Sequence, residues 1–232
     1  MNKQMLKTEI YPAKESKSRR TLVVLHGLGD SAEGYRWLPE ALNLPYLNYI
    51  LVNAPDVYYP GYSWFNIDTQ TLAADPKTVA RSRALLFELF EHLHNNNYPP
   101  EQMVLLGFSQ GCLMTWEVGV RYPRQLAGLI GISGWALEKD GIYDSITEVS
   151  KQQRFLITHG LQDPYISAEK VEEQINKFKS KGLNIEYQVF NKEHTILVEQ
   201  EIPLFRKFIN KVLVEEPINA NVNSCNCKQK QG

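Results

Sequence analysis

The sequence predicts a single α/β domain in which a mostly parallel central sheet is covered by helices on both faces. Three observations lead to this prediction. Short apolar runs rich in β-branched residues recur along the chain, longer segments with helical periodicity separate them, and neither a linker nor an internal repeat interrupts residues 20–213. Strands that are apolar throughout are typical of parallel sheets buried between helices.

The first half of the chain supplies two strands and two helices. "TLVVLHG" (21–27) is typical of a buried strand, and "NYILVNA" (48–54) is the next one. Asp75-Pro76 has the residue types of a helix cap and first helical position. The helical patterns consist of apolar residues at helical spacing: Trp37, Leu38, Ala41 and Leu42 after the first strand, and Val79, Leu86, Leu89, Phe90 and Leu93 after the cap.

The second half alternates in the same way. "QMVLLGF" (102–108) is a strand that leads into a helix over 110–123, which Pro123 ends. A later helix spans 167–181 and ends at Gly182, and the last helix spans 196–213. No insertion is long enough for a large lid domain. The remaining predicted strands are "LAGLIGIS" (126–133), "RFLITHG" (154–160) and "NIEYQVF" (184–190).

The ends of the chain differ from this domain. Residues 1–19 form an N-terminal segment in which "KTEIYPA" is expected to add an antiparallel edge strand, and residues 20–214 form the α/β domain. Residues 215–232 contain almost no apolar residues, so we expect a disordered tail. Cys225 and Cys227 lie in this tail and offer too few ligands for a metal site.

The composition excludes several classes of protein. A formal net charge of −1 provides no field that would attract nucleic acid, so we expect no nucleic-acid partner. The N-terminus lacks the apolar core of a secretory signal, and no run approaches the ~18 apolar residues that stable membrane insertion needs. Three cysteines are too few for a disulfide framework, which makes the cytoplasm the expected compartment.

A serine between two glycines is the first candidate for chemistry. Residues 107–111 read G-F-S-Q-G, with a predicted strand before and a predicted helix after. This pattern fits the strand–turn–helix elbow that exposes a nucleophilic serine at the carboxyl edge of a sheet. A five-residue pattern with two free positions also occurs by chance, but the strand and helix around Ser109 favour the nucleophile.

A serine nucleophile needs a base and an orienting acid, which in this architecture follow it along the chain in the order acid, then histidine. Asp163 lies on the loop that leaves a predicted strand, and His194 lies just past the last strand. Each residue taken singly has a simpler interpretation, a turn start for Asp163 and a helix start for His194. Their order at three strand ends favours a triad of Ser109, Asp163 and His194.

The third requirement is a pair of N–H groups for the oxyanion. Gln110, the residue after the serine, supplies one from its backbone, and the loop "HGLGDS" (26–31) supplies the other. Leu28 and Gly29 are both placed to do so by position, whereas His26 is expected to brace the loop. A phosphate cradle is the rival interpretation of this loop, but it lacks the spacing of the known glycine-rich phosphate motifs.

These segments together resemble the acyl-protein thioesterase/carboxylesterase family of small α/β-hydrolases. The resemblance covers about residues 20–213 and rests on "LHGLGDS", "YSWF", "GFSQG", "ISGW" and "HGLQDP". It implies an α/β-hydrolase fold, the same triad, and the N–H groups of Leu28 and Gln110 as the oxyanion hole. It also implies substrate contacts at Trp135 and at Trp64 near the mouth of an acyl groove.

Two positions depart from the family pattern. Cys112 stands where relatives usually carry a second glycine, and we interpret it as a small packed apolar residue. Glu193 precedes the candidate base, where relatives often have glycine. A carboxylate there raises the pKa of the histidine only if it points inward, so we expect Glu193 to be solvated.

The expected function is therefore that of a serine hydrolase that cleaves ester or thioester bonds of acyl substrates and needs no cofactor or metal. The substrate is a small ester, a lysolipid or an acylated protein. The alternatives are a lysophospholipase or short-chain esterase and, outside enzymes, a binding protein with an inactive hydrolase fold. The inactive form would lack a triad residue, and none is missing. A homodimer is compatible with the sequence.

Overall fold

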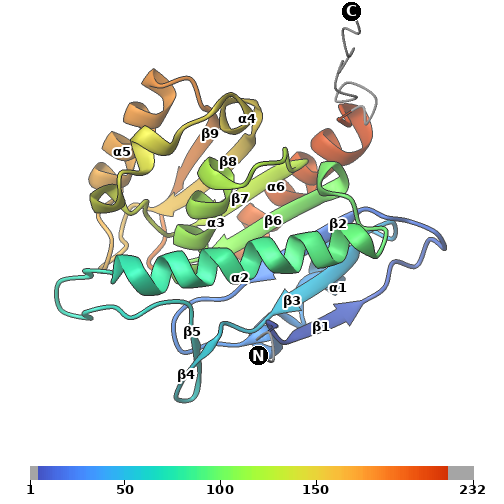
Figure 1. Ribbon diagram of the computed structural model, residues 1–232, viewed down its shortest axis with the longest axis horizontal. Helices are drawn as coiled ribbons and strands as arrows, with labels where there is room; N and C mark the ends of the chain where they lie inside the picture. The colour runs from blue at the N-terminus through green and yellow to red at the C-terminus, as the bar shows by residue number, and fades with distance from the viewer. Residues whose placement is uncertain (1–4, 219–232) are drawn as a thin grey trace, which may run out of the picture.

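Seven strands form one central sheet in the computed structural model, which describes residues 5–218. The strand order is β1-β3-β2-β6-β7-β8-β9, and every neighbouring pair is parallel except β1 with β3 (Figure 1). The strands are β1 (Thr8–Tyr11), β2 (Thr21–Leu25), β3 (Asn48–Val52), β6 (Met103–Phe108), β7 (Gly128–Ile132), β8 (Arg154–Gly160) and β9 (Asn184–Phe190). The predicted parallel sheet and its antiparallel edge strand are both confirmed.

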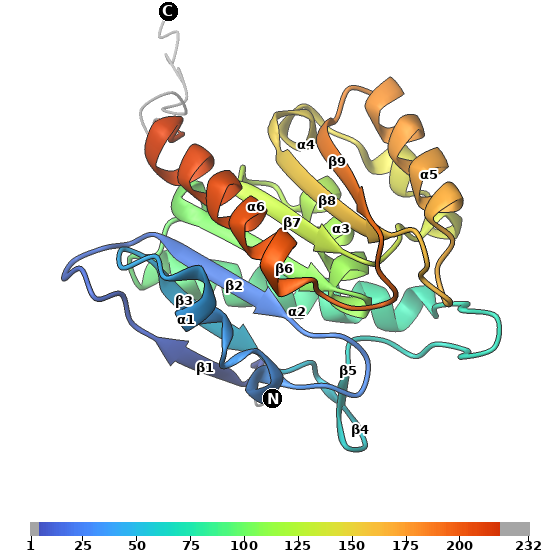
Figure 2. The same cartoon turned by 180° about the vertical axis from the view of Figure 1, so that it is seen from behind.

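Helices cover both faces of this sheet, and alternate side chains of the inner strands β2, β3, β6, β7 and β8 enter two separate cores. In β2, Val23 and Leu25 belong to the core under α2, α3 and α5, whereas Leu22 and Val24 belong to the core under α1 and α6 (Figures 1 and 2). Strands buried on both faces have no polar side to show, which explains their continuous apolar sequences. The helices are α1 (Leu38–Leu42), α2 (Pro76–Asn95), α3 (Gln110–Arg121), α4 (Glu148–Gln152), α5 (Ala168–Ser180) and α6 (Val198–Asn210).

The predicted helix ends are close to the observed ones. Asp75 accepts a hydrogen bond from the Lys77 N–H and caps α2, and Gly182 follows α5 with a φ of +94°. The last helix continues as a single π-helical turn over Lys211–Glu215. That turn buries Leu213 in the core under α6, and the Arg154 guanidinium donates to the Glu216 carbonyl.

Two features go beyond the predicted elements. A small hairpin of β4 (Asp56–Tyr58) and β5 (Gly61–Ser63) stands apart from the sheet, and α4 precedes β8. No helix within residues 5–218 is long and apolar enough to cross a membrane. Most of the predicted disordered tail, including Cys225 and Cys227, lies outside the described residues.

The parallel arrangement determines where a site can form. Because β2, β6, β8 and β9 run in the same direction, the loops that follow them meet at one edge of the sheet. These loops carry "HGLGDS", Ser109, Asp163 and His194. Segments far apart in the sequence are thereby brought to one place.

Candidate active site

Ser109 lies at a sharp turn between β6 and α3. Its backbone has φ 54° and ψ −115°, a conformation that non-glycine residues rarely adopt. The flanking glycines permit this turn, because their neighbours leave no room for a side chain. A Cβ atom on Gly107 would lie 2.1 Å from the Gly111 carbonyl oxygen, and one on Gly111 would lie 2.3 Å from the Leu25 carbonyl oxygen. The G-x-S-x-G spacing is therefore a packing requirement of the elbow.

Hydrogen bonds connect Ser109, His194 and Asp163 in a chain. The Ser109 Oγ lies 2.9 Å from His194 Nε2, and His194 Nδ1 lies 2.7 Å from Asp163 Oδ2. The Asp163 carboxylate is fully buried, and the imidazole is 15% exposed. The hydroxyl is thus placed to donate to one ring nitrogen while the other donates to the carboxylate.

The surroundings of Asp163 keep it ionised. Its Oδ1 accepts hydrogen bonds from the backbone N–H groups of Tyr165 and Ile166, both at 3.0 Å. Burial alone would raise the pKa of this carboxyl. The hydrogen bonds from His194 and the two N–H groups outweigh burial and lower the pKa below its usual value. Asp163 therefore presents a fixed negative charge to the imidazole at neutral pH.

Leu28 and Gln110 line the same cavity as Ser109. Their backbone N–H groups have no hydrogen-bond acceptor within residues 5–218. Gln110 is the first residue of α3, where helical geometry leaves the N–H without a partner. The partial positive charge of a helix N-terminus adds to this donor.

The loop that carries Leu28 is braced by the β4–β5 hairpin. The Gly29 N–H donates to the Tyr62 carbonyl, and the Tyr62 N–H donates to the Asp30 carbonyl, both at 2.9 Å. His26 holds the start of the loop, since its Nδ1 donates to the Gly27 carbonyl at 2.6 Å and its Nε2 accepts from the Ala54 N–H at 3.1 Å. Burial lowers the pKa of His26 and so favours the neutral ring that these bonds require.

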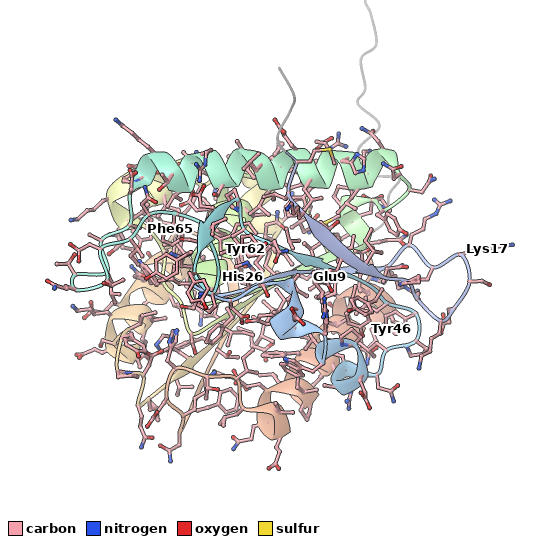
Figure 3. The ribbon with its side chains drawn as sticks, turned by 90° about the horizontal axis from the view of Figure 1, so that it is seen from below. Glu9, Lys17, His26, Tyr46, Tyr62 and Phe65 are labelled. Atoms are coloured by element: carbon pink, nitrogen blue, oxygen red, sulfur yellow. The ribbon has the colours of Figure 1, made fainter. Side chains whose placement is uncertain are left out.

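The Gln110 side chain fastens the segment that follows this hairpin. Its Oε1 accepts from the Trp64 N–H at 2.9 Å, and its Nε2 donates to the Phe65 carbonyl at 3.1 Å. The Ser63 hydroxyl lies 3.2 Å from Oε1, but its one hydrogen is donated over the shorter distance of 2.7 Å to the Phe65 carbonyl. Figure 3 shows His26, Tyr62 and Phe65 gathered on one side of the domain. The residue after the serine therefore has a structural function through its side chain, which the sequence motif does not reveal.

Trp64 does not occupy the expected position at the mouth of the groove. It is fully buried and is not among the residues that line the cavity. Its indole N–H donates to the His26 carbonyl at 2.9 Å, and its ring packs 5.6 Å from the His26 ring. The expectation of a substrate contact is therefore corrected: Trp64 supports the loop from inside. Trp135, by contrast, is half-buried and lines the cavity.

The cavity beside Ser109 has a volume of about 390 Å³ and a largely apolar wall. A larger surface cavity of about 630 Å³ lies between the N-terminal segment and α2, and none of the candidate site residues lines it. The cavity at Ser109 is lined by Gly27, Leu28, Asp30, Ile67, Thr69, Leu72, Phe108, Ser109, Gln110, Trp135, Tyr165, Ile166 and His194.

Several of these lining side chains were not predicted as site residues from the sequence. Ile67 and Leu72 come from the segment before α2 and form one wall. Tyr165 lies edge-on to the imidazole of His194 with ring centroids 5.3 Å apart, and Phe108 lies 5.0 Å from the same ring. Tyr165 follows Asp163 by two residues, so proximity in sequence was the one available indication.

The structure also shows the surroundings of Cys112 and Glu193, the two residues that depart from the family pattern. Cys112 is fully buried against Gly134, where an added Cβ atom would lie 2.4 Å from the Cβ of Cys112. Burial raises the pKa of its thiol to about 12, so the thiol is protonated at neutral pH. Glu193 is exposed, as expected.

The sheet order, the turn at Ser109 and the cavity at the carboxyl edge define an α/β-hydrolase. The model of the phospholipase/carboxylesterase family matches residues 7–213, and the chain belongs to this family. It is thus a hydrolase of the esterase class.

Individual relatives agree with this assignment. Acyl-protein thioesterase 1 of Gibberella zeae is 25% identical over 225 residues, which cover 88% of this chain and 94% of the relative. Acyl-protein thioesterase 1 of Mycosarcoma maydis is 28% identical over 229 residues, with coverage of 88% and 95%. The crystal structure of esterase PE8 has the same fold, with a TM-score of 0.78 at 23% identity, and covers 88% of this chain and 100% of its own.

Proposed function

We propose that the protein hydrolyses thioesters and esters of acyl chains, with Ser109, His194 and Asp163 as its catalytic triad. The observation that carries the proposal is the chain of hydrogen bonds from Asp163 through His194 to Ser109, which ends at an apolar cavity. The relatives named acyl-protein thioesterase support an acylated protein as the substrate.

The first half-reaction forms an acyl-enzyme. His194 Nε2 takes the proton of the Ser109 hydroxyl while Oγ attacks the carbonyl carbon of the substrate. The carbonyl oxygen becomes an oxyanion that accepts hydrogen bonds from the N–H groups of Leu28 and Gln110, each worth about 3 kcal/mol of transition-state stabilisation. Asp163 stabilises the imidazolium. The bond to the leaving sulfur or oxygen then breaks, and the imidazolium donates its proton to the leaving group.

The second half-reaction returns the enzyme to its starting state. Water gives a proton to His194 and attacks the acyl carbon, and the same two N–H groups stabilise the second oxyanion. Collapse of this intermediate releases the carboxylic acid and restores the proton to Ser109. Trp135, Ile67 and Leu72 are the side chains that we assign to the acyl chain, because they form apolar wall beside the serine.

Turnover by matched variants tests this proposal. Ser109→Ala and His194→Ala are expected to lower kcat on an S-acyl peptide by about 10⁴-fold or more, because members of a triad act as a unit. Ser16→Ala and His92→Ala are the controls, since both side chains are exposed and away from the cavity. Retained turnover in either triad variant would exclude the mechanism.

A substrate panel separates the candidate activities. The panel contains an S-acyl peptide, p-nitrophenyl esters of increasing chain length and a lysophospholipid. An acyl-protein thioesterase is expected to have its highest kcat/KM on the S-acyl peptide. A maximum on the lysophospholipid or on the shortest ester would assign the protein to lysophospholipases or short-chain esterases instead.

A further inference from the structure

A buried ion pair lies beneath the loop that carries His194. The Lys192 ammonium lies 2.7 and 2.8 Å from the two carboxylate oxygens of Glu201. Both side chains are fully buried, and neither lines the cavity at Ser109. The triad chemistry uses neither residue, so their presence two residues before the base and in the first turns of α6 calls for an explanation.

Lys192 holds the backbone on both sides of His194. Its ammonium donates a third hydrogen bond to the Thr195 carbonyl at 2.8 Å, directly after the histidine. Its own carbonyl, two residues before the histidine, accepts from the Gln162 N–H at 3.0 Å. Gln162 precedes Asp163, so one lysine connects the loop of the base to the loop of the acid.

Glu201 fixes the other end of this arrangement. One carboxylate oxygen accepts a hydrogen bond from the Thr158 hydroxyl of β8, and the other accepts from the Leu197 N–H at the start of α6, both at 2.6 Å. Together with Lys192, the carboxylate therefore joins a sheet strand, the loop of His194 and the helix behind that loop.

Stability alone does not account for such a pair. Removing two charges from water is costly, and apolar residues of similar volume in place of a buried ion pair are often equally or more stabilising. An apolar pair, however, has no donor for the Thr195 carbonyl. The ion pair differs from an apolar pair because it hydrogen-bonds to the loop that carries His194. The three ammonium hydrogens go to the two carboxylate oxygens of Glu201 and to the Thr195 carbonyl.

We propose that Lys192 and Glu201 are positioning residues, which hold the backbone around His194 so that its Nε2 faces the Ser109 hydroxyl. This inference rests on the proposed function, because it assigns the base to His194. A displacement of about 1 Å between reacting groups lowers rates by about 10²-fold, so a loosened loop is expected to lower kcat by about that factor. KM is expected to change less than threefold, since the cavity wall is intact.

The decisive variant is Lys192→Met/Glu201→Met in the full chain. It removes both charges together and leaves no charge buried alone, but the Thr158 hydroxyl, the Leu197 N–H and the Thr195 carbonyl lose their partners. We therefore expect it to fold with a Tm below that of the unmodified protein and above that of Lys192→Met. Lys192→Met alone leaves the carboxylate unpaired and is expected to lower both Tm and kcat. The control is Glu117→Gln, which perturbs another fully buried carboxylate, one that accepts from Arg83 and Arg121 away from the site.

The assays are kcat and KM on a p-nitrophenyl ester, the rate of labelling by a fluorophosphonate, and Tm. Positioning predicts that the double variant recovers part of the Tm that Lys192→Met loses, but neither kcat nor the labelling rate, whereas Glu117→Gln loses Tm and keeps kcat. Recovery of kcat together with Tm in the double variant, or an equal loss of kcat in Glu117→Gln, would overturn the inference. If Ser109→Ala and His194→Ala were active, the proposed function itself would fail, which is a separate outcome.

Discussion

Replacement of Gln110 by alanine separates the two functions that we assign to this residue. The backbone N–H remains in Gln110→Ala, but the hydrogen bonds of the fully buried side chain with the Trp64 N–H and the Phe65 carbonyl are lost. The Trp64 N–H loses its acceptor, which costs about 1–3 kcal/mol. The Phe65 carbonyl also loses its hydrogen bond from Gln110, but it still accepts from the Ser63 hydroxyl, so this loss costs less free energy. With the cavity that alanine leaves, we expect the free energy of unfolding to fall by about 2–4 kcal/mol.

Urea unfolding and steady-state kinetics measure the two effects. We expect kcat to fall about 3- to 30-fold, because the segment next to the oxyanion loop is loosened while the N–H donor stays, and the loss of one donor costs about 10²–10³-fold. Gln153→Ala is the matched control. Gln153 is equally buried, accepts from the Leu126 N–H and donates to the Arg124 carbonyl, and lies outside the site. An unchanged unfolding free energy, or a variant as inactive as Ser109→Ala, would refute this reasoning.

Three further expectations concern residues around the site. Tyr165→Ala should lower kcat/KM about 2- to 10-fold, because it loses the ring contact with His194. Tyr165→Phe keeps the ring and should match the unmodified protein. Equal kcat/KM values for the two variants in steady-state assays would contradict this. Burial raises the pKa of the Cys112 thiol to about 12, so iodoacetamide should modify it only after denaturation, in a variant whose two tail cysteines are serines; mass spectrometry of the native protein checks this. Burial lowers the pKa of His26 and of His159, so the unfolded chain binds more protons, and the free energy of unfolding should fall as the pH drops below about 6.5, by up to about 1.4 kcal/mol per pH unit for each histidine. Urea unfolding at about pH 7.5 and pH 5.5 measures this, because ordinary carboxylates titrate below this range. Equal free energies of unfolding at the two pH values would contradict the expectation.

Local sequence patterns predicted the sheet because its inner strands are buried on both faces. "TLVVLHG" and "RFLITHG" are apolar throughout and indicated central strands, and "KTEIYPA" was expected to add an edge strand. The β4–β5 hairpin was missed, since its three-residue strands alternate too briefly for a periodic signal. Pro60 in its turn and Gly61 directly after it were the available indication.

The site was predictable to the extent that it depends on motif and order. Ser109, Asp163 and His194 follow from chain order at strand ends, and the structure brings them within hydrogen-bond distance. The complete burial of Trp64 was not predictable, because the local sequence of an apolar loop does not indicate whether its tryptophan faces the cavity or the core. The contacts of Lys192 with Glu201 depend on the fold of α6 against β8, which no local pattern encodes.

The central claim is that Ser109 carries the acyl group during turnover. Rapid acid quenching of the protein with an S-acyl peptide, followed by peptide mapping, tests this directly. We predict an added acyl mass on the peptide that contains Ser109, located on the serine by fragmentation and absent in Ser109→Ala. An acyl mass on Cys112 or elsewhere, with none on Ser109, would contradict the claim.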